Sequence, residues 1–339
     1  MKKLIVIFGL ISWTASFAQL NEELWNYYLY ENQLTDNKVK LIIVERGDIV
    51  NLHIRPDGKT QRIVLANSDK SFFGEDKFYY YGDTLAEVLG YRKENLYINK
   101  EYKYTDGFLE QVDVYNNKLL TKKFIYGTYT NGWINFITEH VMRGYQEEQT
   151  WTKNVKYYED GFIKAIDYRR GFSYHSKFYV YNKETEFIEK EKIRIFENNQ
   201  ETDFREIQTS TYDNGLTKSI TIDGYTQNIS YQFFTDNEFT NALDSLNLVE
   251  SEIKKFEVKK TDLKKQIGTE YEFITKEIIS IHSGYKRKIK EAFESSEKLQ
   301  ILTEAVTELN KYAAMDDKEL KKLNRELKKK YGTQNGFNW

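Results

Sequence analysis

Two hydrophobic periodicities divide this chain. From about Val39 to Phe234, apolar and polar residues alternate in short runs, as where Ile220 and Ile222 flank Thr221. A period of two predicts strands with one face in water, whereas the apolar spacings of three and four after Phe234 predict helices. The pattern therefore predicts an α+β fold by segregation: a long antiparallel β-meander of hairpin repeats followed by a C-terminal α-helical hairpin or coiled-coil-like bundle.

The strand region contains an internal repeat. Three copies of the pattern Tyr-x-[Asp/Asn]-Gly-apolar have their glycine at positions 107, 161 and 215, which are 54 residues apart each time. Weaker copies begin at Tyr129 and Tyr181. An even period of this size indicates a repeat architecture. Because Asp-Gly and Asn-Gly supply the positive φ angles that a hairpin turn needs, we interpret Gly107, Gly161 and Gly215 as structural turn glycines in equivalent hairpins.

Other segments of residues 19–235, the predicted β-repeat domain, have less regular patterns. A short N-terminal helix is predicted after Asn21. A second one is predicted over Leu85–Leu89, because Thr84 and Glu87 have the spacing of a capping box and Gly90 follows. Period-two runs predict strands at Val39–Val44, Ile49–Ile54, Lys122–Tyr126, Gln149–Tyr158, Lys177–Tyr181, Lys192–Phe196 and Ser230–Phe234.

The recurring hairpin resembles the tandem β-hairpin repeats of MORN-like and YD/RHS-like bacterial proteins over residues 104–234. The unit in this chain is longer than a typical MORN repeat, and the extra glycines and the tryptophan of that family are missing. The resemblance implies an elongated, mostly single-layer or shell-like sheet that serves structure or interaction. It implies no active site.

Residues 236–331 form the predicted helical domain, and 332–339 a tail. Two columns of apolar residues recur every seven positions, one through Leu246, Ile253, Ile267, Ile274 and Ile281, the other through Val249, Phe256 and Leu263. Such a heptad seam is typical of packed helices, and the second column slips after Leu263. We expect the first helix to end at Gly284, a second over Tyr285–Tyr312, and a third from an Asp316 cap to Lys330.

The first 18 residues have the pattern of a secretory signal peptide. Lys2 and Lys3 precede the apolar run Leu4–Ile11, and Ser16-Phe17-Ala18 forms a small-x-small cleavage site. The apolar run is shorter than the ~20 residues that span a bilayer. The signal-peptide pattern therefore predicts that the protein is exported, either to the periplasm or to the exterior. No transmembrane segment is expected after it.

Composition narrows the chemistry. The chain has no cysteine, which excludes disulfides, thiol catalysis and cysteine-based zinc sites. A net charge of −2 gives no global field that would recruit nucleic acid or a membrane. The histidines His53, His140, His175 and His282 lack metal-ligand spacing, and no nucleotide-binding or nucleophile motif occurs. We therefore assign no catalytic, cofactor-binding or metal-binding residue and expect no cofactor.

Aromatic residues are the strongest candidates for ligand contacts, since the chain has 27 Tyr and 21 Phe. Seven of them would stack on sugar rings or a peptide if they lined one sheet face: Trp133, Trp151, Tyr157, Tyr168, Tyr174, Tyr179 and Tyr181. The alternative is that they form the core or cross-strand ladders, because aromatics are ordinary strand residues. A basic run from Lys321 to Lys330 is interpreted as a solvated helix face, with an anionic surface as the alternative.

Three functional hypotheses follow. The first is an exported, non-enzymatic interaction or scaffold protein of the cell envelope or exterior, whose partner is another protein bound by the helical tail or the β-repeat face. The second is a glycan- or peptide-binding module that uses the aromatic sheet face. The third is a hydrolase whose carboxylates are scattered in the sequence. The sequence leaves open whether the sheet is open, closed or solenoidal.

Cleavage after Ala18 predicts a mature protein that begins at Gln19. Intact-mass measurement of the exported protein checks this prediction, and a mass that retains Met1 would contradict it.

Overall fold

The computed structural model describes residues 31–332 except 47, 68, 83, 94, 130–132, 145, 160–162, 171–172, 182–187, 196–199 and 223. The chain separates into two compact units. One comprises the residues up to Phe78 together with Glu87–Phe239, and the other comprises Tyr79–Ala86 together with the residues from Thr240 onward.

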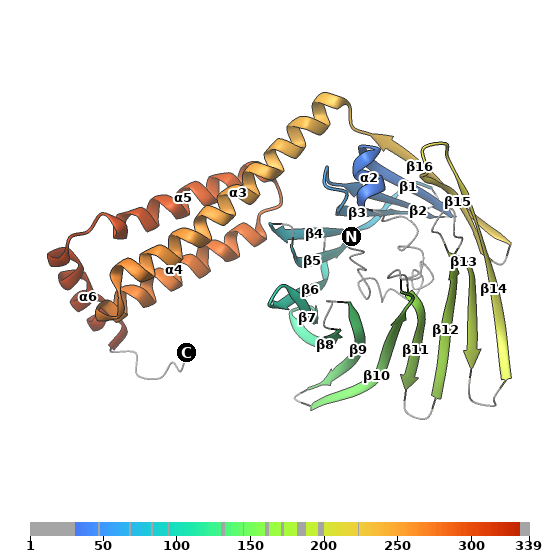
Figure 1. Cartoon of the computed structure of the whole chain (residues 1–339), viewed down its shortest axis with the longest axis horizontal. Helices are drawn as coiled ribbons and strands as arrows, with labels where there is room; N and C mark the ends of the chain where they lie inside the picture. The colour runs from blue at the N-terminus through green and yellow to red at the C-terminus, as the bar shows by residue number, and fades with distance from the viewer. Residues whose placement is uncertain are drawn as a thin grey trace. The chain divides into compact units, whose positions relative to one another are not determined.

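The described residues form sixteen strands that pair antiparallel in chain order (Figure 1). The strands are β1 (Val39–Arg46), β2 (Asp48–Ile54), β3 (Thr60–Ala66), β4 (Phe72–Tyr81), β5 (Thr84–Arg92), β6 (Asn95–Thr105), β7 (Phe108–Asn116), β8 (Leu119–Thr128), β9 (Ile134–Arg143), β10 (Gln146–Tyr157), β11 (Ile163–Arg170), β12 (Ser173–Tyr181), β13 (Ile188–Ile195), β14 (Gln200–Thr211), β15 (Thr217–Ile222) and β16 (Tyr225–Phe233). The predicted meander is confirmed, and each strand predicted from period two coincides with one of these strands within a few residues.

The sheet is closed, because its first strand pairs with its last. In this pairing Val44 lies opposite Ile229, and Ile42 lies opposite Tyr231. Val44 and Ile229 are both buried. Closure leaves β1 and β16 without free backbone edges, which would otherwise offer unpaired N–H and C=O groups to other chains.

The helix predicted over Leu85–Leu89 is wrong, since these residues lie in β5. Val88 pairs with Lys100 and Leu89 with Asn99 of β6. Gly90 is not a helix cap. A β-carbon at Gly90 would lie 2.6 Å from Ile98 Cγ2, so the glycine makes room for the neighbouring strand. Pairing with β6 therefore outweighed the capping-box spacing of Thr84 and Glu87.

Near the N-terminus the structure describes a short helix, α2 (Glu31–Asp36). The helix predicted after Asn21 lies outside the described residues.

Two of the repeat glycines have positive φ, +84° at Gly107 and +81° at Gly215. Asp106 also has a positive φ, and Thr105 pairs with Phe108, so Asp106 and Gly107 form a two-residue turn of type I′. The second turn is longer, because the Tyr212 N–H donates to the Leu216 carbonyl. The expectation of equivalent turns is therefore wrong for this pair. Gly161 lies outside the described residues.

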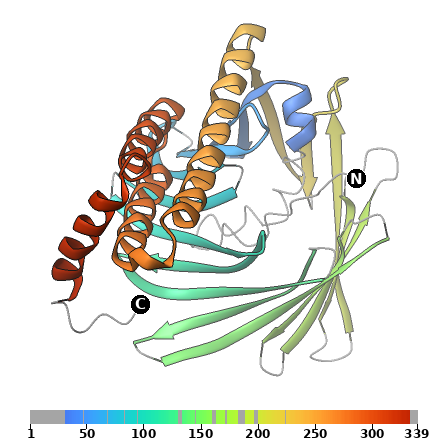
Figure 2. The same ribbon diagram turned by 60° about the vertical axis from the view of Figure 1, so that its left-hand side comes forward.

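After β16 the chain forms α3 (Asp236–Ile267), a 3₁₀ turn η1 (Thr269–Tyr271), α4 (Glu272–Glu291), α5 (Ser295–Ala313) and α6 (Asp317–Gly332). Figures 1 and 2 show α3, α4 and α5 running beside one another. The predicted helix end at Gly284 is wrong, because Gly284 lies inside α4. The break falls at Gly268, which has a φ of +69°. The slip of the heptad column after Leu263 coincides with this break.

Capping boxes begin two of the helices. At α6 the Asp316 N–H donates to Glu319 and the Glu319 N–H donates back to Asp316 Oδ1, at 3.0 and 2.8 Å. The predicted Asp316 cap is therefore confirmed. At α3 the same exchange links Thr235 and Glu238. None of the described helices is both long and apolar enough to cross a membrane.

The helical unit has its own apolar core, which includes Phe256, Ile274 and Leu302. The end of the β4–β5 hairpin belongs to this unit. The buried Lys298 ammonium donates to the Tyr80 carbonyl at 2.7 Å, and the Tyr79 and Phe293 rings meet edge-on with centroids 5.6 Å apart. The domain boundary predicted at residue 235 did not anticipate that the end of this hairpin belongs to the helical unit.

Replacing Gly107 or Gly215 with alanine should lower the free energy of unfolding by ~1 kcal/mol or more, because a β-carbon is strained at these φ angles. Gly284→Ala is the matched control. A β-carbon there would meet nothing within 4 Å, and alanine favours a helix interior over glycine by up to ~1 kcal/mol. Urea unfolding of the three variants checks both signs. Equal losses at all three sites would contradict the assignment.

Candidate functional site

Two of the seven predicted aromatic residues share one sheet face with two lysines. Tyr168 of β11 pairs with Lys153 of β10, and Trp151 lies two residues before Lys153 on the same face. Lys153 Nζ lies 4.6 Å from the Trp151 ring centroid and 5.0 Å from that of Tyr168. Lys177 Nζ lies 6.0 Å from the Tyr168 ring. The result is a cation–aromatic cluster, since ammonium groups are attracted to ring faces at these distances.

The remaining predicted aromatics do not join this cluster. Trp133 and Tyr157 contact each other, with ring centroids 5.0 Å apart. Tyr179 is buried in β12. Tyr174 pairs with Arg169 and therefore lies on the opposite face from Tyr168. Tyr181 is described only by its place at the end of β12. The seven residues thus do not form a single row.

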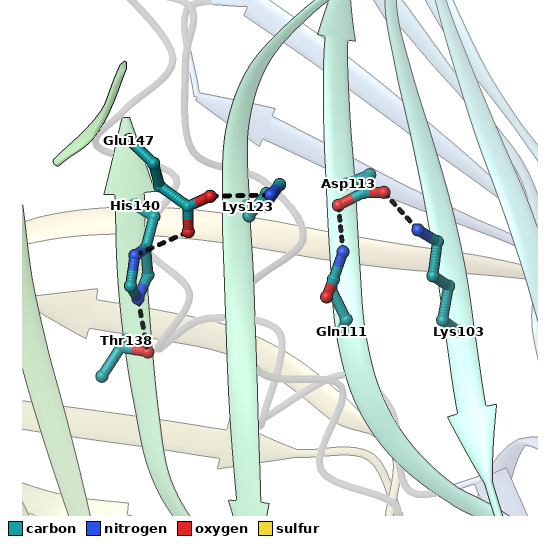
Figure 3. A network of polar contacts seen from close by, with 7 residues as sticks. All are labelled: Lys103, Gln111, Asp113, Lys123, Thr138, His140 and Glu147. Carbon is teal, nitrogen blue, oxygen red and sulfur yellow. Dashed lines mark hydrogen bonds and ion pairs between the residues drawn. The ribbon is translucent and has the colours of Figure 1, made fainter. Parts of the chain in front are cut away.

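The opposite face carries a polar network across β6–β10, drawn in Figure 3. The Glu147 carboxylate accepts a hydrogen bond from the Lys123 ammonium at 2.7 Å and lies 3.0 Å from His140 Nδ1. The second ring nitrogen of His140 lies 3.3 Å from Thr138 Oγ1. The hydrogen bond from Lys123 and the charges nearby hold the pKa of Glu147 below its ordinary range. Glu148, the next residue, pairs instead with Arg143 on the other face.

Asp113 occupies the same face as Lys123, its partner in register. Its carboxylate accepts hydrogen bonds from Lys103 at 2.6 Å and from Gln111 at 2.5 Å (Figure 3). The Asp113 side chain is buried, whereas Lys103 is half exposed. Because the paired lysine can still reach water, this ion pair neutralises a buried carboxylate without burying a second charge.

Two further buried carboxylates are paired with lysines. Glu139 lies 3.0 Å from Lys122 Nζ, and Asp167 lies 2.6 Å from Lys156 Nζ. Burial raises the pKa of Asp167, but the hydrogen bonds from Lys156 and Ser176 outweigh burial and leave the pKa below its ordinary value. Within the described residues, no group of three or more His, Asp or Glu side chains has the arrangement of a metal site.

The repeat tyrosines have a structural role that sequence reasoning missed. Tyr158 and Tyr212 open two copies of the repeat, and each hydroxyl donates to a backbone carbonyl of another strand, that of Tyr179 at 3.1 Å and that of Ile229 at 3.0 Å. In both copies the lysine six residues later lies over the tyrosine ring, Lys164 at 5.5 Å and Lys218 at 5.9 Å. The tyrosine therefore connects its hairpin to neighbouring backbone.

The helical unit contains one dense polar centre, around Glu257. This carboxylate accepts a hydrogen bond from the Tyr81 hydroxyl at 2.7 Å and lies 3.1 Å from His282 Nε2 and 3.4 Å from Lys286 Nζ. The buried His282 ring stacks on Phe256 with centroids 4.4 Å apart. The close contact with His282 and the hydrogen bond from Tyr81 lower the pKa of Glu257 far below its ordinary value, despite partial burial. This centre holds the hairpin end to the helices.

Comparisons with known proteins give no family. No family model matches the chain, and no curated protein matches it. Solved structures with similarity include a porin-like protein from Bacteroides uniformis, with 9% identity, a TM-score of 0.40, and coverage of 58% of this chain and 97% of that chain. A Photorhabdus luminescens Tc holotoxin pore has 10% identity and a TM-score of 0.28 over 52% of this chain and 9% of that chain. A TcdB2–TccC3 structure has 7% identity and a TM-score of 0.17 over 57% and 16%.

These similarities are too low to support an argument about the function of this chain. Moreover, the chain spans only a small part of the two toxin structures.

Tyr158→Phe and Tyr212→Phe should each lower the free energy of unfolding by about 1 kcal/mol, because each change removes one hydroxyl hydrogen bond and keeps the ring. Tyr97→Phe, at an exposed tyrosine of β6 outside the repeat, is the matched control. Chemical denaturation compares the three. If Tyr97→Phe costs as much as the other two, the hydroxyl contacts do not matter for stability.

The lowered pKa of Glu257 predicts that the stability of the helical unit depends on pH. Because its pKa is lowered by folding, the stabilisation is complete above the ordinary glutamate pKa of ~4.3 and is lost as the pH falls through the folded pKa. Urea unfolding followed by helical circular dichroism should show a loss between pH 5 and strongly acidic pH that is smaller in Glu257→Gln. The same pH profile in both proteins would rule out this role.

Proposed function

We propose that the chain is an exported, non-enzymatic interaction or scaffold protein of the cell envelope or exterior, with another protein as its partner. One observation supports this proposal above the others: four sheet carboxylates each lie within 3.0 Å of a lysine ammonium. The carboxylates are Asp113, Glu139, Glu147 and Asp167.

Carboxylates paired with lysines in this way are better suited to stabilising the sheet than to acid–base catalysis. A glycosidase-type hydrolase needs one carboxyl that keeps its proton near neutral pH and a second one that is ionised, roughly 5–9 Å away. A lysine at hydrogen-bond distance favours the ionised form. Glu147 and Asp167 accordingly have lowered pKa values and are poor proton donors. This argument makes the hydrolase hypothesis the weakest of the three.

The cation–aromatic cluster supports a second candidate function, the binding of a glycan or peptide. Trp151 and Tyr168 are only partly buried and flank the Lys153 ammonium. Aromatic faces stack on sugar rings, and two ammonium groups beside them would favour an acidic sugar or an acidic peptide. Lys153→Met keeps the side-chain length and removes the charge. It should abolish binding of acidic oligosaccharides in a tryptophan-fluorescence titration if this candidate is right.

Two parts of the proposal concern export from the cell and the resemblance to repeat families. The signal-peptide pattern of residues 1–18 lies outside the described residues, so it rests on the sequence alone. The long antiparallel meander is compatible with the tandem β-hairpin repeats of MORN-like and YD/RHS-like proteins. In those terms, the repeat body would serve as a framework and not as a catalytic domain.

Site-specific photo-crosslinking in the native cells tests the main proposal. A photoreactive residue would replace Leu119 and Tyr225, which are 72% and 70% exposed on the sheet, and Val258, which is exposed on α3. The buried Ile220 is the matched control. We expect one defined adduct from at least one exposed position and none from Ile220. No adduct from any exposed position, or the same adducts from Ile220, would contradict a protein partner.

A further inference from the structure

The last helix, α6, carries far more positive charge than the rest of the chain. Its 16 residues include seven Lys or Arg and three Asp or Glu, whereas the whole chain has a net charge of −2. The sequence interpretation treated the basic run as a solvated face balanced by nearby acids. The structure shows how the charges are distributed around the helix.

Four of the cations form one stripe along α6. Lys318, Lys322, Arg325 and Lys329 follow at spacings of four, three and four, so they lie on one side of a helix with 3.6 residues per turn. All four are exposed. Asp317 and Glu319 lie about 100° around the helix from Lys318, whereas Glu326 follows one turn after Lys322 and borders one edge of the stripe.

The other side of α6 is occupied by the helical core. Leu327 is buried there, and Leu320 and Leu323 pack against the same core. Asn324 accepts the backbone N–H of Phe273 at 3.1 Å through its side-chain oxygen. These contacts fix the rotation of the helix, so that the cationic stripe faces solvent.

The chemistry of the stripe favours an extended anionic surface as its partner. Protein interfaces centre on apolar and aromatic side chains, and this stripe has none. Insertion of α6 into a bilayer is excluded, because its leucines are used in the core. A row of Lys and Arg without apolar residues fits the phosphates of anionic lipids, which attract such rows electrostatically.

We propose that the α6 stripe binds the surface of an anionic phospholipid membrane. This contact goes beyond the protein partner proposed above and does not depend on it. It is purely electrostatic and therefore reversible and sensitive to salt, because exposed charges are screened beyond a Debye length of ~8 Å at physiological ionic strength.

Vesicle co-sedimentation tests the proposal with the purified protein. Vesicles of phosphatidylglycerol and phosphatidylcholine should bind the protein at low salt and release it at high salt, and vesicles of phosphatidylcholine alone should not bind it. The variant Lys318→Gln/Lys322→Gln/Arg325→Gln should bind at least ~10-fold more weakly, since each cation near an anionic surface contributes.

The control variant Lys254→Gln/Lys264→Gln/Lys265→Gln removes the same charge from exposed positions of α3. It should bind like the unmodified protein, and both variants should keep the unmodified circular dichroism spectrum and melting temperature. Equal weakening in both variants, or no binding by the unmodified protein, would overturn the proposal. Binding to polyglutamate but not to anionic vesicles would also overturn it and would indicate an acidic polypeptide.

Discussion

The pairing of β1 with β16 is the constraint on which the sheet unit depends. The chain has no cysteine, so no disulfide fixes its ends, and the meander is held by backbone hydrogen bonds and side-chain packing. Local hairpins bring each strand beside the next, but the β1–β16 contact joins residues nearly two hundred positions apart, such as Val44 and Ile229. Closing so long a loop has an entropic cost, which the burial of apolar side chains on β1 and β16 helps to offset.

Within the closed sheet, charge and aromatic contacts act across strands. Lysines neutralise carboxylates on neighbouring strands, so that the buried Asp113 and Asp167 keep hydrogen-bond partners. Tyr158 and Tyr212 tie two hairpin turns to backbone outside the hairpin. The residues that look most conspicuous in the sequence repeat are therefore used for holding strands together.

The fold was predictable to the extent that its signals are local. Alternation at Ile220–Ile222 predicted a strand, and the Asp316 cap predicted a helix start. The Leu85–Leu89 prediction failed because pairing with β6 is not local. Gly268 and Gly284 are both glycines in a helical pattern, and only the backbone conformation shows which one breaks it.

The polar network around Glu147 could not be predicted from the sequence, because it too depends on strand pairing that is not local. Lys123 and Glu147 are 24 residues apart, and their contact depends on a register that shifts at a bulge between Gln149 and Trp151. One irregular residue moves every later side chain relative to its neighbours. Alternation predicts that Glu147 and Glu148 face opposite ways, but not which lysine meets Glu147.

The proposed function depends most on the sheet carboxylates being structural ions and not catalytic acids. Carboxyl-detected NMR titration of the folded protein measures this directly. Glu147 and Asp167 should titrate below the ordinary values of ~4.3 and ~3.9 for their residue types. A pKa near 6 or above at either residue, the range of a general acid, would contradict it.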